Sequence, residues 1–217
     1  MREGYGNQRL AREGWWLVIF IFISAIFTFL YFSAWFSIAL FMVASVGIYL
    51  LRNPGVVLPS SPLAVISPVH GRVISIDKQD DPWLSRPATR VVIQNGFWDV
   101  HTIRSPVEGK LMKDWSAPCE DPGFNRRHAY WFQTDEGDDI VMSFRLGPYS
   151  PYTRMLPSCG DRSGQGTQCG FLFFKGAIAL YLPENTWVEV KVGDNVMAGT
   201  DIIGTFVHKE GSTLTGK

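Results

Sequence analysis

The sequence has few cysteines and no excess of charge of either sign. Its three cysteines, Cys119, Cys159 and Cys169, show no C-x-x-C spacing, which argues against a disulfide scaffold or a zinc ribbon and fits a reducing compartment. The 217 residues include 20 basic and 20 acidic side chains, so nothing in the charge balance favours a nucleic acid as a partner. Only 18% of the residues are charged and 46% are hydrophobic, which excludes a disordered chain.

One long segment, residues 15–51, contains neither a charged residue nor a proline. About 20 apolar residues are enough for a helix to cross the hydrocarbon core of a bilayer. One helix over this whole segment would be too long, whereas two short helices would fit. We therefore expect a transmembrane helical hairpin that turns near Ser33-Ala34-Trp35, with a single tilted span as the alternative.

Basic residues flank this apolar segment on both sides, with Arg12 before it and Arg52 after it. Because basic residues favour the cytoplasmic side, we expect both ends of the hairpin there. The predicted location is the inner or cytoplasmic membrane, with the remainder of the chain on the cytoplasmic side. The expected parts are a tail (1–14), the hairpin (15–51), a linker (52–64) and a β-rich domain (65–217).

After the linker the pattern changes to short runs rich in Val and Ile, separated by Gly, Pro, Asp and Asn, which predicts a mainly β domain. The motif S-P-V-x-G occurs twice, at 67–71 and 105–109, each time before an apolar run. The tail at 190–204 adds glycine-spaced turn signals. Together these segments predict a barrel-sandwich-hybrid core of the biotinyl or lipoyl kind, with an ordinary small β sandwich as the alternative.

Six motifs follow one another along the chain: R-N-P at 52–54, I-S-P-V-H-G-R-V at 66–73, D-V-H-T-I-R-S-P-V-E-G at 99–109, G-D-R at 160–162, G-F-L-F-F at 170–174 and A-L-Y-L-P at 179–183. In this order, behind an apolar hairpin, they resemble the short membrane-bound phosphatidylserine decarboxylases. The resemblance implies a precursor that cuts itself at a Gly-Ser bond, so that the serine remnant becomes a pyruvoyl group. It also implies that an Asp and a His activate this serine, and that the pyruvoyl ketone forms a Schiff base with the substrate amine.

The chain departs from this family pattern where the chemistry takes place. Lys175 stands at the expected glycine, Gly176 at the expected serine and His70 at the expected aspartate, while the histidine is retained as His101. Glycine has no side-chain oxygen and cannot form the ester from which a pyruvoyl group arises. We therefore expect no pyruvoyl or other cofactor and no active catalytic residue, with His70, His101 and Lys175 as a candidate head-group cleft.

The predicted function is a non-catalytic, membrane-anchored member of this family that serves as a structural or assembly subunit or binds phospholipid. The alternative is an active decarboxylase with another electron sink, such as pyridoxal phosphate on Lys175. Two further hypotheses are a carrier modified at Lys78 and a metal site of His70, His101 and His128, with Asp99 as a further candidate ligand. The carrier is indicated only by the common dipeptide Asp77-Lys78. The histidines lack H-x-x-x-H spacing, so we expect no metal. The expected partners are membrane lipids, other membrane-protein subunits or a second copy of the chain, and no nucleic acid.

Overall fold

The computed structural model describes the chain over residues 15–31, 34–50, 52–59, 61, 63–117, 127–146, 153–155, 157–172 and 175–208.

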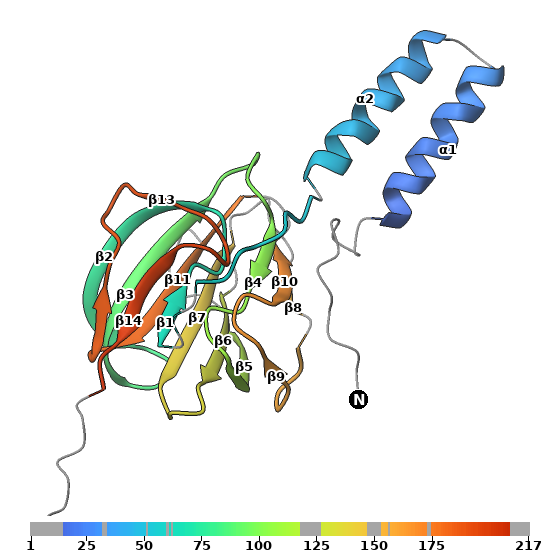
Figure 1. The fold of residues 1–217 in the computed structure, drawn as a ribbon. Coiled ribbons are helices and arrows are strands. Elements are labelled where there is room, and N and C mark those ends of the chain that lie inside the picture. The colour runs from blue at the N-terminus through green and yellow to red at the C-terminus, as the bar shows by residue number, and fades with distance from the viewer. Residues whose placement is uncertain are drawn as a thin grey trace, which may run out of the picture.

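Two helices, α1 (Trp15–Tyr31) and α2 (Ala34–Leu50), form an antiparallel pair that projects from the β domain (Figure 1). Phe22 of α1 meets Phe41 of α2 edge to face, with ring centroids 5.3 Å apart. Most of the large apolar side chains of the pair are exposed. The apolar segment of the sequence thus forms helices that bury little of their own surface.

The prediction of a transmembrane helical hairpin is wrong. The apolar segment is divided between two helices of 17 residues each, whereas a spanning helix needs about 20. No helix among the described residues is both long and apolar enough to cross a membrane.

Outside α1 and α2, all the longer regular elements of the described chain are strands, which confirms the prediction of a mainly β domain. The sheets are antiparallel, with strand orders β13-β2-β3-β11-β7-β6-β5-β9, β1-β14-β12 and β4-β10-β8. The narrower expectation of a barrel-sandwich hybrid stays a prediction. The strands are β1 (Ala64–Ile66), β2 (Gly71–Asp81), β3 (Arg86–Asn95), β4 (Thr102–Arg104), β5 (Gly109–Ala117), β6 (Arg127–Gln133), β7 (Asp139–Leu146), β8 (Thr153–Met155), β9 (Arg162–Ser163), β10 (Gln168–Leu172), β11 (Gly176–Pro183), β12 (Thr186–Val188), β13 (Asn195–Val196) and β14 (Ile202–Phe206).

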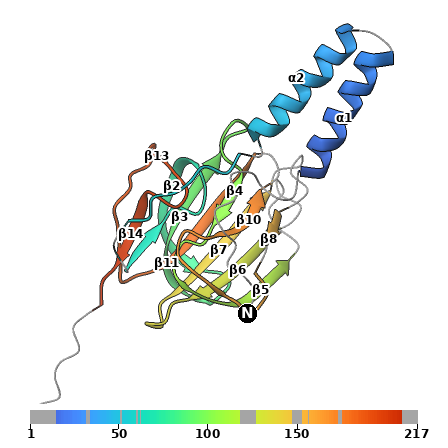
Figure 2. The same ribbon diagram turned by 45° about the vertical axis from the view of Figure 1, so that its right-hand side comes forward.

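The core lies between the large sheet and the two small ones. Alternate residues of neighbouring strands point into it: Val91 and Ile93 of β3 pair with Leu180 and Ile178 of β11, and all four are fully buried. This alternation is the period of two that a half-buried strand imposes. Figures 1 and 2 both show the sheet β4-β10-β8 on the side of the domain nearest the helices.

The two S-P-V-x-G segments fold into equivalent turns. The Ser67 hydroxyl donates to the carbonyl oxygen of Val69 at 2.7 Å, and the Ser105 hydroxyl donates to that of Val107 at 2.8 Å. Both serines are fully buried, so each hydroxyl needs this intramolecular partner. The motif is therefore repeated in structure as well as in sequence.

The two turns are also bonded to each other. The N–H of Ile66 donates to the carbonyl oxygen of Pro106 at 3.0 Å, and the N–H of Arg104 donates to that of Pro68 at 2.8 Å. Each bond joins the residue just before one S-P-V-x-G segment to the proline of the other. This reciprocity relates the two halves of the β domain by an approximate internal two-fold symmetry.

A second repeat, absent from the sequence-based expectations, completes this symmetry. The motif G-D-x-x-x-x-G-T begins at Gly160 and again at Gly193, and both glycines have a positive φ, 96° and 102°. The N–H of Gly160 donates to the carbonyl oxygen of Leu111 at 2.7 Å, and that of Gly193 to Val73 at 2.8 Å. Each copy is thus hydrogen-bonded to the strand that follows one S-P-V-x-G turn.

Candidate functional site

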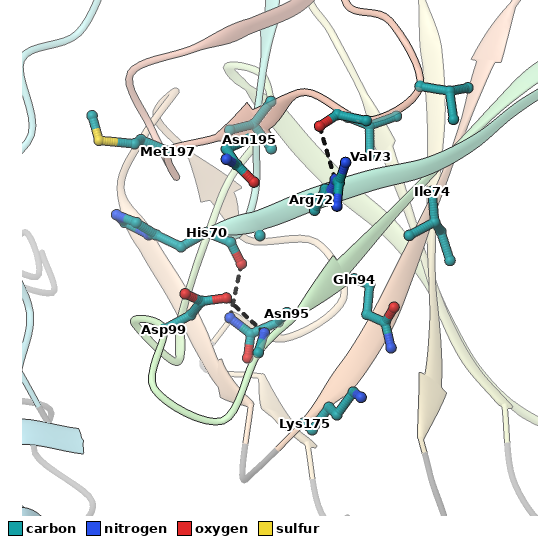
Figure 3. Close-up of a pocket in the computed structure, with 15 residues that line it drawn as sticks. His70, Arg72, Val73, Ile74, Gln94, Asn95, Asp99, Lys175, Asn195 and Met197 are labelled. Atoms are coloured by element: carbon teal, nitrogen blue, oxygen red, sulfur yellow. Dashed lines mark hydrogen bonds between the residues drawn. The ribbon is translucent and has the colours of Figure 1, made fainter.

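A cleft of about 670 Å³ opens where three segments distant in sequence meet: the start of β2, the end of β3 with the loop after it, and the segment leading into β13. Figure 3 shows the side chains around this cleft. Its lining combines polar groups with an apolar wall, and includes His70, Arg72, Val73, Ile74, Gln94, Asn95, Asp99, Lys175, Val192, Asn195, Val196 and Met197.

His70 is half-buried at the mouth of the cleft. Its Nδ1 accepts a hydrogen bond from the N–H of Ala198 at 3.3 Å, which places the proton of the neutral ring on Nε2. Burial lowers the pKa of His70, Arg104 and Arg52 lower it further, and Asp99 opposes the shift. The neutral imidazole is therefore favoured near pH 7.

We expect the free energy of unfolding to decrease as the pH falls below about 6.5. The pKa values of His70 and His101 are lowered in the folded chain, so over that range the unfolded chain binds protons that the folded chain does not. The neutral rings contribute their full stability above the pKa of the unfolded chain. As the pH falls from that value to the lower pKa of the folded chain, this stability is lost. Urea unfolding of wild type and His70→Asn, whose amide oxygen can replace Nδ1, checks this. The free energy of unfolding of the variant is expected to depend less steeply on pH. An unchanged slope would contradict the lowered pKa of His70.

Asn95, the last residue of β3, and Asp99, in the loop after it, form the floor of the cleft. The Nδ2 group of the fully buried Asn95 donates to the carbonyl oxygens of His70 at 2.8 Å and Val100 at 3.1 Å. The Oδ2 atom of Asp99 accepts from the N–H of Gly96 at 2.6 Å. The loop is therefore closed at both ends and holds both side chains in fixed positions.

Two cations lie at the rim. Arg72 is exposed, and its Nε donates to the carbonyl oxygen of Gly193 at 2.9 Å. Lys175 is exposed directly before β11. In Figure 3 Arg72, from β2, and Lys175, from the residue before β11, lie on either side of Gln94. The rim thus offers positive charge, while the floor offers one carboxylate.

His101 lies behind the cleft and is only 3% exposed. Its Nε2 is 3.0 Å from the carbonyl oxygen of Phe97, which can only accept, so Nε2 carries the proton. Its Nδ1 has no hydrogen-bond partner among the described residues. Burial lowers the pKa of His101, with the hydrogen bond to Phe97 opposing the shift. The structure therefore brings His70 and Lys175 together and leaves His101 outside the lining of the cleft.

Gly176 is buried at the start of β11, where it pairs with Asn95 of β3 and Leu146 of β7. A Cβ atom added at Gly176 would lie 3.2 Å from both δ-methyl groups of Leu172. Leu172 is itself fully buried in the core. A side chain at position 176 would therefore require Leu172 to shift by a few tenths of an ångström.

No group of three His, Cys, Asp or Glu side chains within the described part of the chain could hold a metal ion. His128, one member of the metal site considered from sequence, lies on β6 between Ser116 of β5 and Phe144 of β7. It is not among the residues that line the cleft.

Comparison with known proteins finds relatives along almost the whole chain. A protein of Nitrosomonas eutropha named phosphatidylserine decarboxylase proenzyme is 30% identical over 211 residues, covering 93% of this chain and 97% of the relative. The chain belongs to the phosphatidylserine decarboxylase family. Proteins of the same name from Nitrosomonas europaea and Aromatoleum aromaticum are 29% and 25% identical, over 93% and 94% of this chain and 97% and 98% of theirs. No family model and no solved structure matches the chain.

Membership of the phosphatidylserine decarboxylase family corrects one expectation. The prediction that no cofactor is involved is contradicted, because the relatives are named proenzymes and their family uses a pyruvoyl group formed by self-cleavage. The prediction rested on the departures from the family pattern at Gly176 and His70.

The residues described around the family's serine position do not fit the pyruvoyl group. Gly176 supplies no hydroxyl, and Leu172 occupies the neighbouring space. Lys175 points to the rim of the cleft rather than into the core, since it is exposed. The family chemistry therefore has no side-chain oxygen to start from at this position.

Sequence reasoning named two of the cleft residues, His70 and Lys175, and missed Asn95 and Arg72 as site residues. The signal for Asn95 was available, because Asn-Gly marks a turn and ends two residues before the D-V-H motif. No local pattern distinguishes Arg72 from other strand arginines. It lines the cleft only because the segment before β13 folds beside β2.

Proposed function

We propose that this phosphatidylserine decarboxylase family protein binds phospholipid head groups at a membrane surface and does not turn them over. The observation that carries the proposal is the combination of an open cleft that has charged side chains in its lining with Gly176, which has no side-chain oxygen. Binding requires the cleft, whereas the family reaction requires an oxygen that position 176 does not provide.

The charges of the cleft suit a phospholipid head group. Arg72 and Lys175 at the rim can contact a phosphate, and Asp99 on the floor can contact a cationic group. His70, with its pKa lowered, adds a neutral N–H donor rather than a third positive charge. The cleft thus offers both signs of charge, as a zwitterionic ligand requires.

Exposed aromatic side chains beside the cleft support contact with a lipid surface. Phe97 and Trp98, in the loop after β3, are 41% and 59% exposed. The Trp98 ring lies 6.3 Å from that of Tyr49 at the end of α2, and Arg52 donates to the carbonyl oxygen of Trp98 at 3.2 Å. In Figure 1 this loop rises toward the base of α2. Aromatic rings favour the interface between lipid and water, so the loop and the exposed helices would contact the same lipid layer.

A matched pair of variants tests this function. Arg72 in the cleft and Lys110 outside it hold equivalent positions in the two S-P-V-x-G repeats. Arg72→Gln is expected to weaken binding to phosphatidylcholine vesicles that contain phosphatidylserine by about fivefold, whereas Lys110→Gln is expected to leave it unchanged. Co-sedimentation measures binding, and release of carbon dioxide from labelled phosphatidylserine measures turnover.

Each of the two measurements can contradict a different part of the proposal. Equal effects of both variants would indicate general charge attraction instead of a cleft. Carbon dioxide release above that of protein-free vesicles would show an active enzyme. The cytoplasmic orientation, and an association with other membrane-protein subunits or a second copy, stay predictions.

A further inference from the structure

A second hollow lies apart from the cleft, where β12 begins and β14 ends. It encloses about 700 Å³ and shares no lining residue with the cleft. The Trp187 side chain is 70% exposed and Val207 is 53% exposed. An exposed tryptophan beside a hollow is typical of a surface that binds another molecule, because tryptophan often contributes a large part of the affinity at interfaces. The lining consists of Glu184, Asn185, Thr186, Trp187, Val207 and His208.

β12 is also an edge strand. It pairs with β14 in the sheet β1-β14-β12, and no other strand of the described chain pairs with it. The Asn185 carbonyl oxygen accepts from the N–H of Val207 at 2.8 Å, and the N–H of Glu189 donates to a carbonyl oxygen of β14 at 2.9 Å. Because alternate residues of a strand bond to opposite neighbours, the backbone groups of Thr186 and Val188 point away from β14. These groups can bond to one additional strand.

The charge at the two ends of β12 is negative. Glu184 precedes the strand, Glu189 follows it, and both are exposed. The four residues between them, N-T-W-V, carry no charge, and the first base after the strand is Lys191. Asp138 adds a carboxylate that lies 2.6 Å from Nε2 of His208 in the lining of the hollow. A second copy of the chain would bring the same acids together at this edge, whereas a basic segment would neutralise them.

The hollow faces away from the proposed lipid layer. Figures 1 and 2 both show β14, to which β12 is bonded, on the side of the β domain away from α1 and α2. The exposed helices and the loop of Phe97 and Trp98 would contact lipid on the opposite side. The occupant of the hollow therefore approaches from water, which favours a segment of a soluble protein over a lipid.

We propose that β12 binds an extended basic segment of a partner protein, which adds a strand to the sheet β1-β14-β12. The backbone of the partner bonds to Thr186 and Val188, and one of its apolar side chains packs against Trp187. Basic side chains two positions before and after that apolar residue lie near Glu184 and Glu189. The main-chain bonds give affinity to any extended segment, whereas the apolar and basic side chains give selectivity.

A designed peptide tests strand addition on the full-length chain. The probe is fluorescein-labelled T-K-T-V-T-K-T, which places one valine and two lysines on the same face of a strand. Two analogues are the glutamate peptide T-E-T-V-T-E-T and the lysine peptide N-methylated at its third and fifth residues. The first reverses the charge, and the second removes the two N–H donors that would bond to β12. Fluorescence anisotropy is expected to show at least about tenfold weaker binding of both analogues.

Two exposed tryptophans provide matched variants. Trp187→Thr keeps a residue suited to a strand and is expected to weaken binding of the lysine peptide at least about fivefold. Trp98→Thr, at a residue that is 59% exposed on the side of the helices, is expected to leave peptide binding unchanged. Equal loss in both variants would show that the peptide does not bind at β12 and would overturn the proposal.

Other occupants of this edge give different results, each of which would overturn the proposal. Equal binding of the lysine peptide and its N-methylated form would show charge attraction without an added strand, and no binding of the lysine peptide would exclude the proposed partner chemistry. Loss of vesicle binding in Trp187→Thr would assign the hollow to lipid. A dimer of wild type that is lost in Trp187→Thr, measured by sedimentation velocity, would assign the edge to a second copy of the chain.

Discussion

Replacement of Gly71 or Gly109 by alanine is expected to lower the free energy of unfolding by about 3 kcal/mol. A Cβ atom at Gly71 would overlap the carbonyl oxygen of Gln94, and one at Gly109 would overlap that of Gln133. Both obstacles are backbone atoms of paired strands, which cannot move away as a flexible side chain can. The two strands would have to separate where each S-P-V-x-G turn enters its strand.

Chemical denaturation with circular dichroism measures the loss of stability. Gly164→Ala is the matched control, because its Cβ would meet only the γ-methyl group of Thr167, at 3.3 Å. We expect this control to stay within about 0.5 kcal/mol of wild type. If Gly71→Ala and Gly109→Ala behaved like the control, the close strand approach at the two turns would be contradicted.

Replacement of Arg104 by methionine is expected to cost about 3 kcal/mol of stability and to release the segment after α2. The buried guanidinium donates to the carbonyl oxygens of Gly166 at 2.8 Å and Pro54 at 2.9 Å, and to Oδ1 of Asn53 at 2.7 Å. Methionine fills a similar volume but leaves these buried acceptors without donors. Burial lowers the pKa of Arg104.

Two measurements separate the effects of Arg104→Met. Urea unfolding reports the stability, and limited proteolysis reports cleavage between α2 and β1. Arg162→Met is the control, since Arg162 is exposed and its ion pairs with Glu108 and Asp135 lie at the surface, where such pairs contribute little. Unaltered proteolysis in Arg104→Met would show that Arg104 does not hold the segment.

The repeats illustrate how far sequence reasoning reached. The S-P-V-x-G pair was visible because proline and glycine recur at fixed positions within a short motif. The G-D-x-x-x-x-G-T pair was missed although its spacing is identical in both copies, since single glycines and aspartates are common in turns. Only the hydrogen bonds from Gly160 to Leu111 and from Gly193 to Val73 show that the two segments have the same structural role.

The apolar segment illustrates where composition misleads. Residues 15–51 contain enough apolar residues for a membrane span, but their hydropathy does not determine where a helix ends. The structure ends α1 at Tyr31 and begins α2 at Ala34, which leaves each helix with 17 residues. The length of the helices, and not the character of the segment, overturned the expectation.

The amino-acid sequence alone determined the β-rich character of the domain, the family likeness and the missing hydroxyl at Gly176, because each follows from local residue patterns or from the identity of one side chain. The tertiary structure decided the rest. It placed Leu172 against Gly176, set the amide of Asn95 on the floor of the cleft and brought Arg72 and Lys175 to its rim. These residues come from segments far apart in the chain, and only strand pairing and core packing bring such segments together.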